Sequence, residues 1–257
     1  MIKTVLITGA SSGIGKATAL RFAQEGNFRL ILCARRKERL EVLTTEIQNQ
    51  FKAECHLLCF DIRDKESVEN AILSLPKDWE DIDILINNAG LALGLDLIHE
   101  GNTDHWDIMI DTNVKGLVYI TRLVSKKMVE RKTGHIVNLC STAGKEVYPK
   151  GNVYCASKFG VDALTRAIRQ DLYLYGIRVG QVSPGHVEET EFAINRFEGD
   201  VERANIYKDF TPLKARDVAD AIYYMVSAPA HVNILDIVMT SSQQGSATLV
   251  DRSGRKY

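Results

Sequence analysis

The chain has 257 residues, of which 45% are hydrophobic and 25% are charged, and its formal net charge is −1; this near-neutral charge argues against a nucleic-acid partner. No apolar run approaches the length of a membrane span and no signal peptide is recognisable, so we expect a cytoplasmic protein without a membrane partner. The five cysteines fit free thiols in a reducing compartment, and no Cys/His spacing predicts a metal site.

Short apolar runs alternate with segments that have the three- and four-residue apolar spacing of helices. The runs predicted as buried strands are 4–7, 30–34, 56–60, 84–86, 136–139, 179–182 and 234–239. The segments predicted as helices include 17–25, 36–50 and 154–175. Apolar strands separated by helices indicate an α/β fold with a parallel sheet covered on both faces. We therefore expect one domain over residues 1–257, built on a doubly wound sheet of about seven strands.

The first predicted strand runs into a glycine-rich turn before a helix begins. Glycines let the backbone approach a pyrophosphate closely, and a helix N-terminus offers free N–H groups to that anion. The alternative is a turn with a structural role only. In this context we predict a dinucleotide-binding turn, with cofactor contacts from Gly9, Ser11, Ser12, Gly13, Ile14 and Gly15.

The second predicted strand ends in two arginines, Arg35 and Arg36. Folds that prefer NAD place a carboxylate at this strand end to bind the ribose diol. The guanidinium groups would instead attract the extra phosphate of NADP, whose oxygens they match well. We predict NADP as the cofactor, although both arginines could merely cap an exposed strand end.

The ends of the next two strands carry further predicted cofactor contacts. Asp61 and Ile62 follow the third strand and are assigned to the adenine. Asn88, Ala89 and Gly90 follow the fourth, where small residues let the backbone lie close to a ligand. Since the carboxyl ends of parallel strands share one edge of the sheet, we expect these residues to line one cleft.

Tyr154 and Lys158 are four residues apart and would share one face of a helix. A neighbouring ammonium favours the phenolate and would lower the tyrosine pKa from about 10, so that the side chain can exchange a proton with an alcohol. Ser141, after the fifth strand, would polarise the substrate oxygen beside it. The amide of Asn113 would hold a water linked to Lys158.

The sixth predicted strand leads into a segment expected to close over the nicotinamide. Its predicted cofactor contacts are Pro184, Gly185, Val187 and Thr190. His186 is interpreted as lining the pocket at most, because Tyr154 already fills the role of acid.

The glycine-rich turn, Asn87-Asn88-Ala89-Gly90, Asn113, Ser141 and Tyr154-x3-Lys158, in this order, resemble the short-chain dehydrogenase/reductase family over almost the whole chain. The resemblance implies a Rossmann-type fold, nicotinamide chemistry and a catalytic tetrad of Asn113, Ser141, Tyr154 and Lys158. It also implies that Tyr154 and Lys158 contact the cofactor. A homotetramer, with contacts through long helices at 102–131 and 152–176, is implied as well.

Segments 85–94, 151–154, 190–192, 196–200 and 229–234 are similar to the NADP-dependent 3-hydroxy acid dehydrogenases. That group is also described as serine or L-allo-threonine dehydrogenase and malonic semialdehyde reductase. The resemblance implies hydride exchange between NADP and a small 3-hydroxy acid. Glu188 and Glu189 depart from the glycines common in bacterial members, and could repel an acidic substrate or bind its ammonium group.

Substrate recognition leaves several alternatives open. Arg196 would bind a substrate carboxylate or be a surface arginine, and Lys145 and Lys150 compete for the same role. Tyr148 and Asn152 would line the pocket with Ser141 and Tyr154. A broader carbonyl reductase or a 3-oxoacyl thioester reductase would use the same catalytic residues. A non-catalytic NADP-binding sensor is a further alternative, but such a protein would not need the Ser141 hydroxyl, the Tyr154 phenol and the Lys158 ammonium together.

Overall fold

The computed structural model describes residues 2–255, and its centre is one seven-stranded sheet. The strands lie in the order β3-β2-β1-β4-β5-β6-β9, and every neighbouring pair is parallel. This confirms the predicted doubly wound parallel sheet, with the strand order reversing between β1 and β4. The last strand begins two residues later than predicted. The strands are β1 (Lys3–Thr8), β2 (Phe28–Ala34), β3 (Cys55–Cys59), β4 (Ile84–Asn87), β5 (Gly134–Leu139), β6 (Ile177–Pro184) and β9 (Asp236–Met239).

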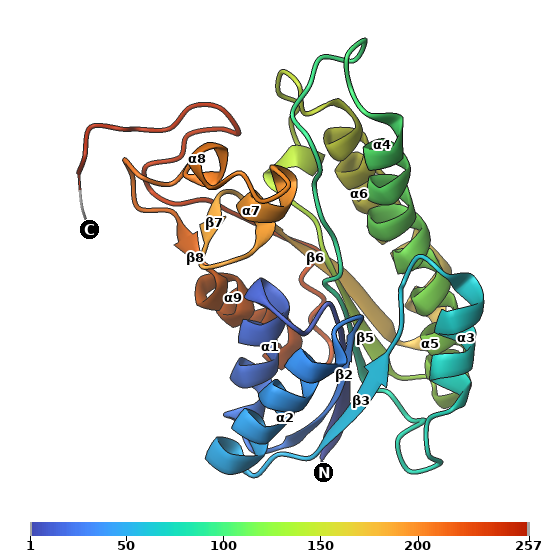
Figure 1. Cartoon of the computed structure of the whole chain (residues 1–257). Helices are drawn as coiled ribbons and strands as arrows, with labels where there is room; N and C mark the ends of the chain where they lie inside the picture. The colour runs from blue at the N-terminus through green and yellow to red at the C-terminus, as the bar shows by residue number, and fades with distance from the viewer. Residues whose placement is uncertain (1, 256–257) are drawn as a thin grey trace.

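Helices cover both faces of the sheet, as predicted. On one face lie α1 (Gly13–Ala23), α2 (Lys37–Phe51) and α9 (Ala215–Ser227) (Figure 1). The other face carries α3 (Lys65–Leu73), α4 (Thr103–Ile110), α5 (Leu117–Arg131) and α6 (Asn152–Leu172) (Figure 1). Because both faces are covered, the open carboxyl edge of the sheet is the part left for a ligand.

The helix predicted over 102–131 is interrupted. A π-helical turn, η1 (Asp111–Gly116), separates α4 from α5. The helix predicted over 152–176 ends in a 3₁₀ turn, η3 (Tyr173–Tyr175). A π turn widens the backbone locally and is often found at functional sites, and Asn113 lies in this one.

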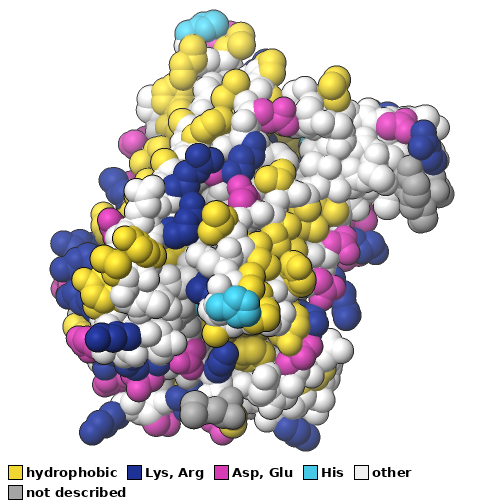
Figure 2. Space-filling view, turned by 180° about the vertical axis from the view of Figure 1, so that it is seen from behind, with side chains coloured by type: hydrophobic (Ala, Val, Ile, Leu, Met, Phe, Trp, Pro, Cys, Tyr) yellow, Lys and Arg dark blue, Asp and Glu magenta, His cyan; other side chains and the backbone are white. Residues whose placement is uncertain are grey.

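The surface mixes polar and apolar side chains. In the view from behind, basic, acidic and apolar side chains are interspersed (Figure 2). Exposed apolar side chains include Phe159 on α6 and Tyr173 and Leu174 just beyond it. Across residues 2–255, no helix has both the length and the apolar character needed to cross a membrane.

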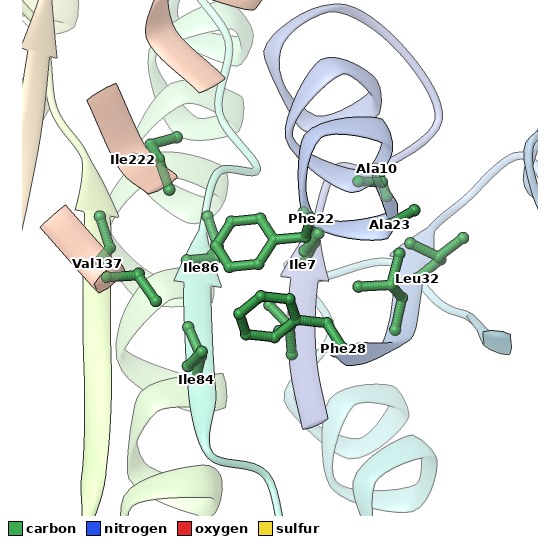
Figure 3. Packing of buried hydrophobic residues seen from close by; sticks show 14 of the residues in the cluster. Ile7, Ala10, Phe22, Ala23, Phe28, Leu32, Ile84, Ile86, Val137 and Ile222 are labelled. Atoms are coloured by element: carbon green, nitrogen blue, oxygen red, sulfur yellow. The ribbon is translucent and has the colours of Figure 1, made fainter. Parts of the chain in front are cut away.

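The strands are continuous apolar runs in the sequence because their side chains are buried on both faces of the sheet. Along β1, Val5 and Ile7 pack on the side of α1 and α9, whereas Leu6 packs on the side of α3 and α5. Figure 3 shows Phe22 of α1 and Phe28 of β2 close together among the aliphatic side chains on the α1 and α9 side of the sheet. Their ring centroids are 4.9 Å apart in an edge-to-face arrangement. This packing fixes the strand ends that carry the site.

A smaller layer stands over the carboxyl edge of the sheet (Figure 1). It contains the two-stranded sheet of β7 (Val187–Glu188) and β8 (Leu213–Lys214), and the short helices α7 (Phe192–Arg196) and α8 (Val201–Ala204). We call residues 185–197 the lid segment. It follows β6 directly, so the end of the sheet determines where the lid segment starts.

Candidate active site

One cavity of about 840 Å³ lies at the carboxyl ends of the strands. It brings together residues from the glycine-rich turn, the ends of β2 to β6, the start of α6 and the lid segment. The predicted site residues that line it are Gly9, Ser11, Ser12, Gly13, Ile14, Arg35, Arg36, Asp61, Ile62, Asn88, Ala89, Gly90, Ser141, Tyr148, Tyr154, Lys158, Pro184, Gly185, Val187, Thr190 and Arg196. Gly15, Asn113 and Asn152 do not line it.

The glycine-rich turn has the tight geometry that a pyrophosphate site needs. Gly9 and Gly13 have φ values of +68° and +51°, in the left-handed region that favours glycine. A Cβ on Gly15 would lie 2.2 Å from the Gly9 carbonyl oxygen and 2.5 Å from Asn88 Nδ2. Gly15 therefore lets α1 pack against the turn, while the other glycines face the cavity. The space beside the glycine-rich turn fits a dinucleotide, and side chains larger than glycine at these positions would fill it.

The end of β2 offers cations to an anionic ligand. Arg36 Nη2 donates hydrogen bonds to Ser11 Oγ (3.1 Å) and Ser12 Oγ (3.0 Å), so the guanidinium is held against the glycine-rich turn. Arg35 is more exposed and lies 3.8 Å from Asp61. The Asp61 carboxylate accepts hydrogen bonds from the Arg63 guanidinium, which hold the pKa of Asp61 below its usual value. The arginines therefore lie where a phosphate on the adenosine ribose would bind.

Tyr154 and Lys158 lie together on α6, and both are buried. Lys158 Nζ donates to the carbonyl oxygen of Leu139 at 2.9 Å. Ser141, in the turn after β5, accepts from the N–H of Ala143 at 3.1 Å and shares a hydrogen bond with the Tyr154 hydroxyl. The fold thus brings the predicted hydroxyl, phenol and ammonium to one wall of the cavity.

The predicted lowering of the Tyr154 pKa is wrong for the free protein. Burial raises that pKa, and the hydrogen bond with Ser141 lowers it by less. Burial also lowers the pKa of Lys158, whose ammonium is directed to a backbone carbonyl. Low polarity disfavours the charged form of each group. Tyr154 is therefore a neutral phenol, which is the form that donates a proton.

Asn113 is buried and holds the loop after β4 through its side-chain amide. Its Oδ1 accepts from the N–H of Leu91 at 2.9 Å, and its Nδ2 donates to the Leu91 carbonyl at 2.9 Å and to Ser157 Oγ at 3.0 Å. A buried amide has to be hydrogen-bonded, and this one is bonded to the loop after β4 and to Ser157 of α6. A Cβ on Gly90 would lie 3.2 Å from Asn113 Oδ1 and 3.5 Å from Lys158 Nζ, so both groups adjoin this loop.

Arg196 is buried in the cavity wall, which excludes the interpretation as a surface arginine. It is 8% exposed, and donates from Nε to the Gly94 carbonyl (3.1 Å) and from Nη1 to the Tyr148 hydroxyl (3.1 Å). Its guanidinium carbon is 5.6 Å from the centroid of the Tyr154 ring. None of the carboxylates within residues 2–255 forms an ion pair with it. A buried cation without a counterion is costly, so the site is suited to an anionic ligand.

The other candidates for substrate recognition lie elsewhere. Lys145 forms ion pairs with Asp162 and Asp236, and Lys150 is exposed outside the main cavity. Asn152 Nδ2 donates to the backbone of the loop after β4 at 3.0 Å. Lys145 is therefore held by its carboxylate partners, whereas Lys150 and Asn152 line a small second cavity with Tyr154 and Arg196.

Glu188 and Glu189 of the lid segment also lie outside the cavity wall. Glu189 pairs with Lys214 at 3.0 Å on the surface, and Glu188 belongs to β7. Neither repulsion of an acidic substrate nor binding of its ammonium group is supported by these positions.

Aromatic residues and a C-terminal glutamine complete the pocket. Phe192 packs against Tyr154, with ring centroids 5.7 Å apart, and Tyr207 packs against His186. Gln244, far along the chain, accepts from the His186 N–H at 2.9 Å. Burial lowers the pKa of His186, so it is a neutral lining residue, as its sequence position suggested. No motif marks Tyr207 or Gln244, because only the fold brings them to the cavity.

Comparison with known proteins agrees with this geometry. A family model described as short chain dehydrogenase matches residues 3–200. The chain belongs to this family. The predicted family resemblance and the prediction of a dehydrogenase acting on a CH–OH group are thereby confirmed.

Several relatives in the family are named for the small molecules on which they act. The chain is 43% identical to the NADP-dependent 3-hydroxy acid dehydrogenase YdfG of Salmonella typhi, with 95% of this chain and 97% of that protein covered. It is 44% identical to sulfoacetaldehyde reductase 2 of Chromohalobacter salexigens, with 98% and 100% covered. The closed form of serine dehydrogenase complexed with NADP+ superposes with a TM-score of 0.90 at 42% identity, with 96% of this chain and 98% of that chain covered.

Proposed function

We propose that this short-chain dehydrogenase interconverts a small 3-hydroxy acid, of the serine or 3-hydroxypropionate type, and the corresponding 3-oxo acid or semialdehyde. The observation that carries the proposal is the buried guanidinium of Arg196, which has no carboxylate partner among the described residues and lies over the Tyr154 ring. A substrate carboxylate would supply the missing counterion. The same contact would hold the reacting carbon beside the phenol.

The cofactor of this oxidoreductase is NADP, which supplies or accepts a hydride when bound. Arg35 and Arg36 stand at the end of β2, where a carboxylate would favour NAD. The glycine-rich turn and the helix that follows would hold the pyrophosphate. NADP-dependent relatives and neighbours with bound NADP support the assignment.

The proton step belongs to the residues of this chain. In the direction of reduction, the neutral Tyr154 hydroxyl donates its proton to the substrate carbonyl oxygen as that oxygen gains negative charge. The Ser141 hydroxyl donates a second hydrogen bond to the same oxygen and stabilises the charge. In oxidation, Tyr154 first releases its own proton to solvent, and its phenolate oxygen then accepts the proton of the alcohol. Lys158 and Asn113 complete the proposed tetrad, and Lys158 would also bind the cofactor ribose.

The decisive experiment compares substrates with and without a negative charge. Arg196→Leu should lower kcat/KM about 100-fold on a 3-hydroxy acid, because a charge-assisted hydrogen-bonded pair is lost, but only slightly on the methyl ester. Lys150→Asn is the matched control, since Lys150 is a nearby exposed cation with a positive φ that asparagine tolerates. Equal proportional losses on acid and ester would contradict the proposal.

The alternatives predict other outcomes in the same assay. A broader carbonyl reductase or a 3-oxoacyl thioester reductase would prefer the neutral ester or thioester. Turnover of a sulfonate aldehyde, the kind of substrate in the name of one relative, would depend on Arg196 as turnover of a carboxylate does, so the assay includes such a compound. A sensor would turn over none of these compounds.

We also propose that the whole chain, 1–257, is one catalytic domain that acts as a homotetramer. The exposed apolar side chains of Phe159, Tyr173 and Leu174, on and after α6, would be buried in such an assembly. Sedimentation of the native protein measures its mass in solution and tests this.

A further inference from the structure

Glu191, in the lid segment, bridges two arginines of the opposite wall. Its carboxylate forms an ion pair with Arg36 Nη2 at 2.8 Å and a second one with Arg39 on α2. Glu191 and Arg36 both line the main cavity. These contacts join a residue after β7 to residues after β2, and they link the lid segment to the adenosine end of the site.

The carboxylate lies beside the groups expected to bind the cofactor phosphate. The same Arg36 nitrogen also donates to Ser11 Oγ and Ser12 Oγ in the glycine-rich turn. Burial raises the pKa of Glu191, but the hydrogen bonds from Arg39 and Arg36 outweigh this effect and hold the pKa below its usual value. Glu191 is therefore an anion at neutral pH. A carboxylate and a phosphate each present a pair of oxygen acceptors, and a guanidinium group can donate two parallel hydrogen bonds to either pair.

We propose that Glu191 is a specificity-determining residue that competes with the ribose 2′-phosphate of NADP for Arg36 and Arg39. The proposal rests on the proposed use of NADP. When the phosphate binds, the Glu191 carboxylate has to leave at least one arginine, because two anions cannot share the fork without repulsion. NAD has no such phosphate, and its ribose 2′-hydroxyl can donate a hydrogen bond to a carboxylate. Glu191 thus weakens the binding of NADP but not that of NAD, and so reduces the preference of the protein for NADP over NAD.

The test measures the dissociation constants of NADP+ and NAD+ for the native protein and for Glu191→Gln, without substrate. Loss of the competing charge should tighten NADP+ binding about fivefold, as expected for a partly exposed ion pair, and leave NAD+ binding unchanged or weaker. Glu189→Gln is the matched control, since it removes a charge from the same segment outside the cavity and should change neither constant. Weaker NADP+ binding, or an equal change for both cofactors, would overturn the proposal.

A second measurement confines the effect to the phosphate. Adenosine 2′,5′-bisphosphate should bind Glu191→Gln more tightly than it binds the native protein, whereas adenosine 5′-monophosphate should bind both alike. Equal gains for the two nucleotides would place the effect in closure of the lid segment and overturn the competition. If the native protein binds neither NADP+ nor NAD+, the proposed function fails as well. If it binds NADP+ and Glu191→Gln is unchanged, only this inference fails.

Discussion

At the scale of single residues, burial determines the chemistry of Tyr154. The phenol is enclosed by the cavity wall, so its pKa is raised and its proton is retained in the free enzyme. Lys158, one helical turn away, is also buried and has a lowered pKa. The pair therefore favours the neutral acid needed for reduction of a carbonyl, and ionisation of the phenol requires a change in its surroundings.

Tyr154→Phe should lower kcat about a thousandfold on every substrate, because the proton donor is lost while the pocket is kept.

In the free native enzyme, a pKa raised above 10 means that Tyr154 contributes no tyrosinate between pH 7 and 10. The ultraviolet difference spectrum of tyrosinate, native minus Tyr154→Phe, measures this. A tyrosinate signal with a midpoint below pH 9 would contradict the raised pKa.

At the scale of elements, an ion-pair network fixes the turn that carries Ser141. Lys145 follows the 3₁₀ turn η2 (Thr142–Gly144) and pairs with Asp162 on α6 and Asp236 on β9. Each of these side chains is less than one third exposed. The turn after β5 is thereby attached both to the helix that carries Tyr154 and to the edge strand.

Lys145→Met should lower the free energy of unfolding by about 3 kcal/mol, because it leaves two partly buried carboxylates without their shared cation. Lys37→Met is the control, since Lys37 forms only an exposed pair with Glu41 on α2 and should have a much smaller effect. Chemical denaturation of the two variants measures both values. Equal losses would show that the Lys145 network contributes no more than a surface pair.

Strand ends were predictable from the sequence, whereas contacts between distant segments were not. The strand-turn-helix pattern after Thr8 and the spacing of Tyr154 and Lys158 are local signals, and the fold realises both. The π turn around Asn113 has no signature in apolar spacing, because it adds a single residue to a helical turn. The bridge from Glu191 to Arg36 depends on tertiary packing, which no local pattern contains.

At the scale of the whole molecule, the parallel sheet buries a titratable group on β5. His135 on β5 is 2% exposed, and neither of its ring nitrogens has a hydrogen-bond partner among residues 2–255. Burial, with smaller contributions from Arg178 and Lys3, lowers the pKa of His135 to about 3. The folded protein therefore keeps this imidazole neutral under conditions in which the unfolded chain binds a proton.

Stability should fall on acidification through this one group. Above the unfolded pKa of about 6.5, the His135 imidazole is neutral in both states and does not lower the free energy of unfolding. As the pH falls from 6.5 towards 3, the free energy of unfolding decreases by about 1.4 kcal/mol per pH unit, because the unfolded chain binds a proton that the folded protein does not. Denaturation of the native protein and of His135→Leu at pH 7 and pH 5 measures the difference. The variant should lose about 2 kcal/mol less than the native protein between these two pH values. Identical pH dependence would show that His135 is already protonated or exposed.

The central claim is that a nicotinamide-dependent dehydrogenase site selects a small acid through Arg196. The most direct measurement is kcat/KM for 3-hydroxypropionate, serine, their methyl esters and an uncharged secondary alcohol, each with NADP+ and with NAD+. We expect the native enzyme to use the free acids best and to prefer NADP+, and we expect the advantage of the acids to disappear in Arg196→Leu. Equal or better use of the esters and the uncharged alcohol by the native enzyme would contradict this claim.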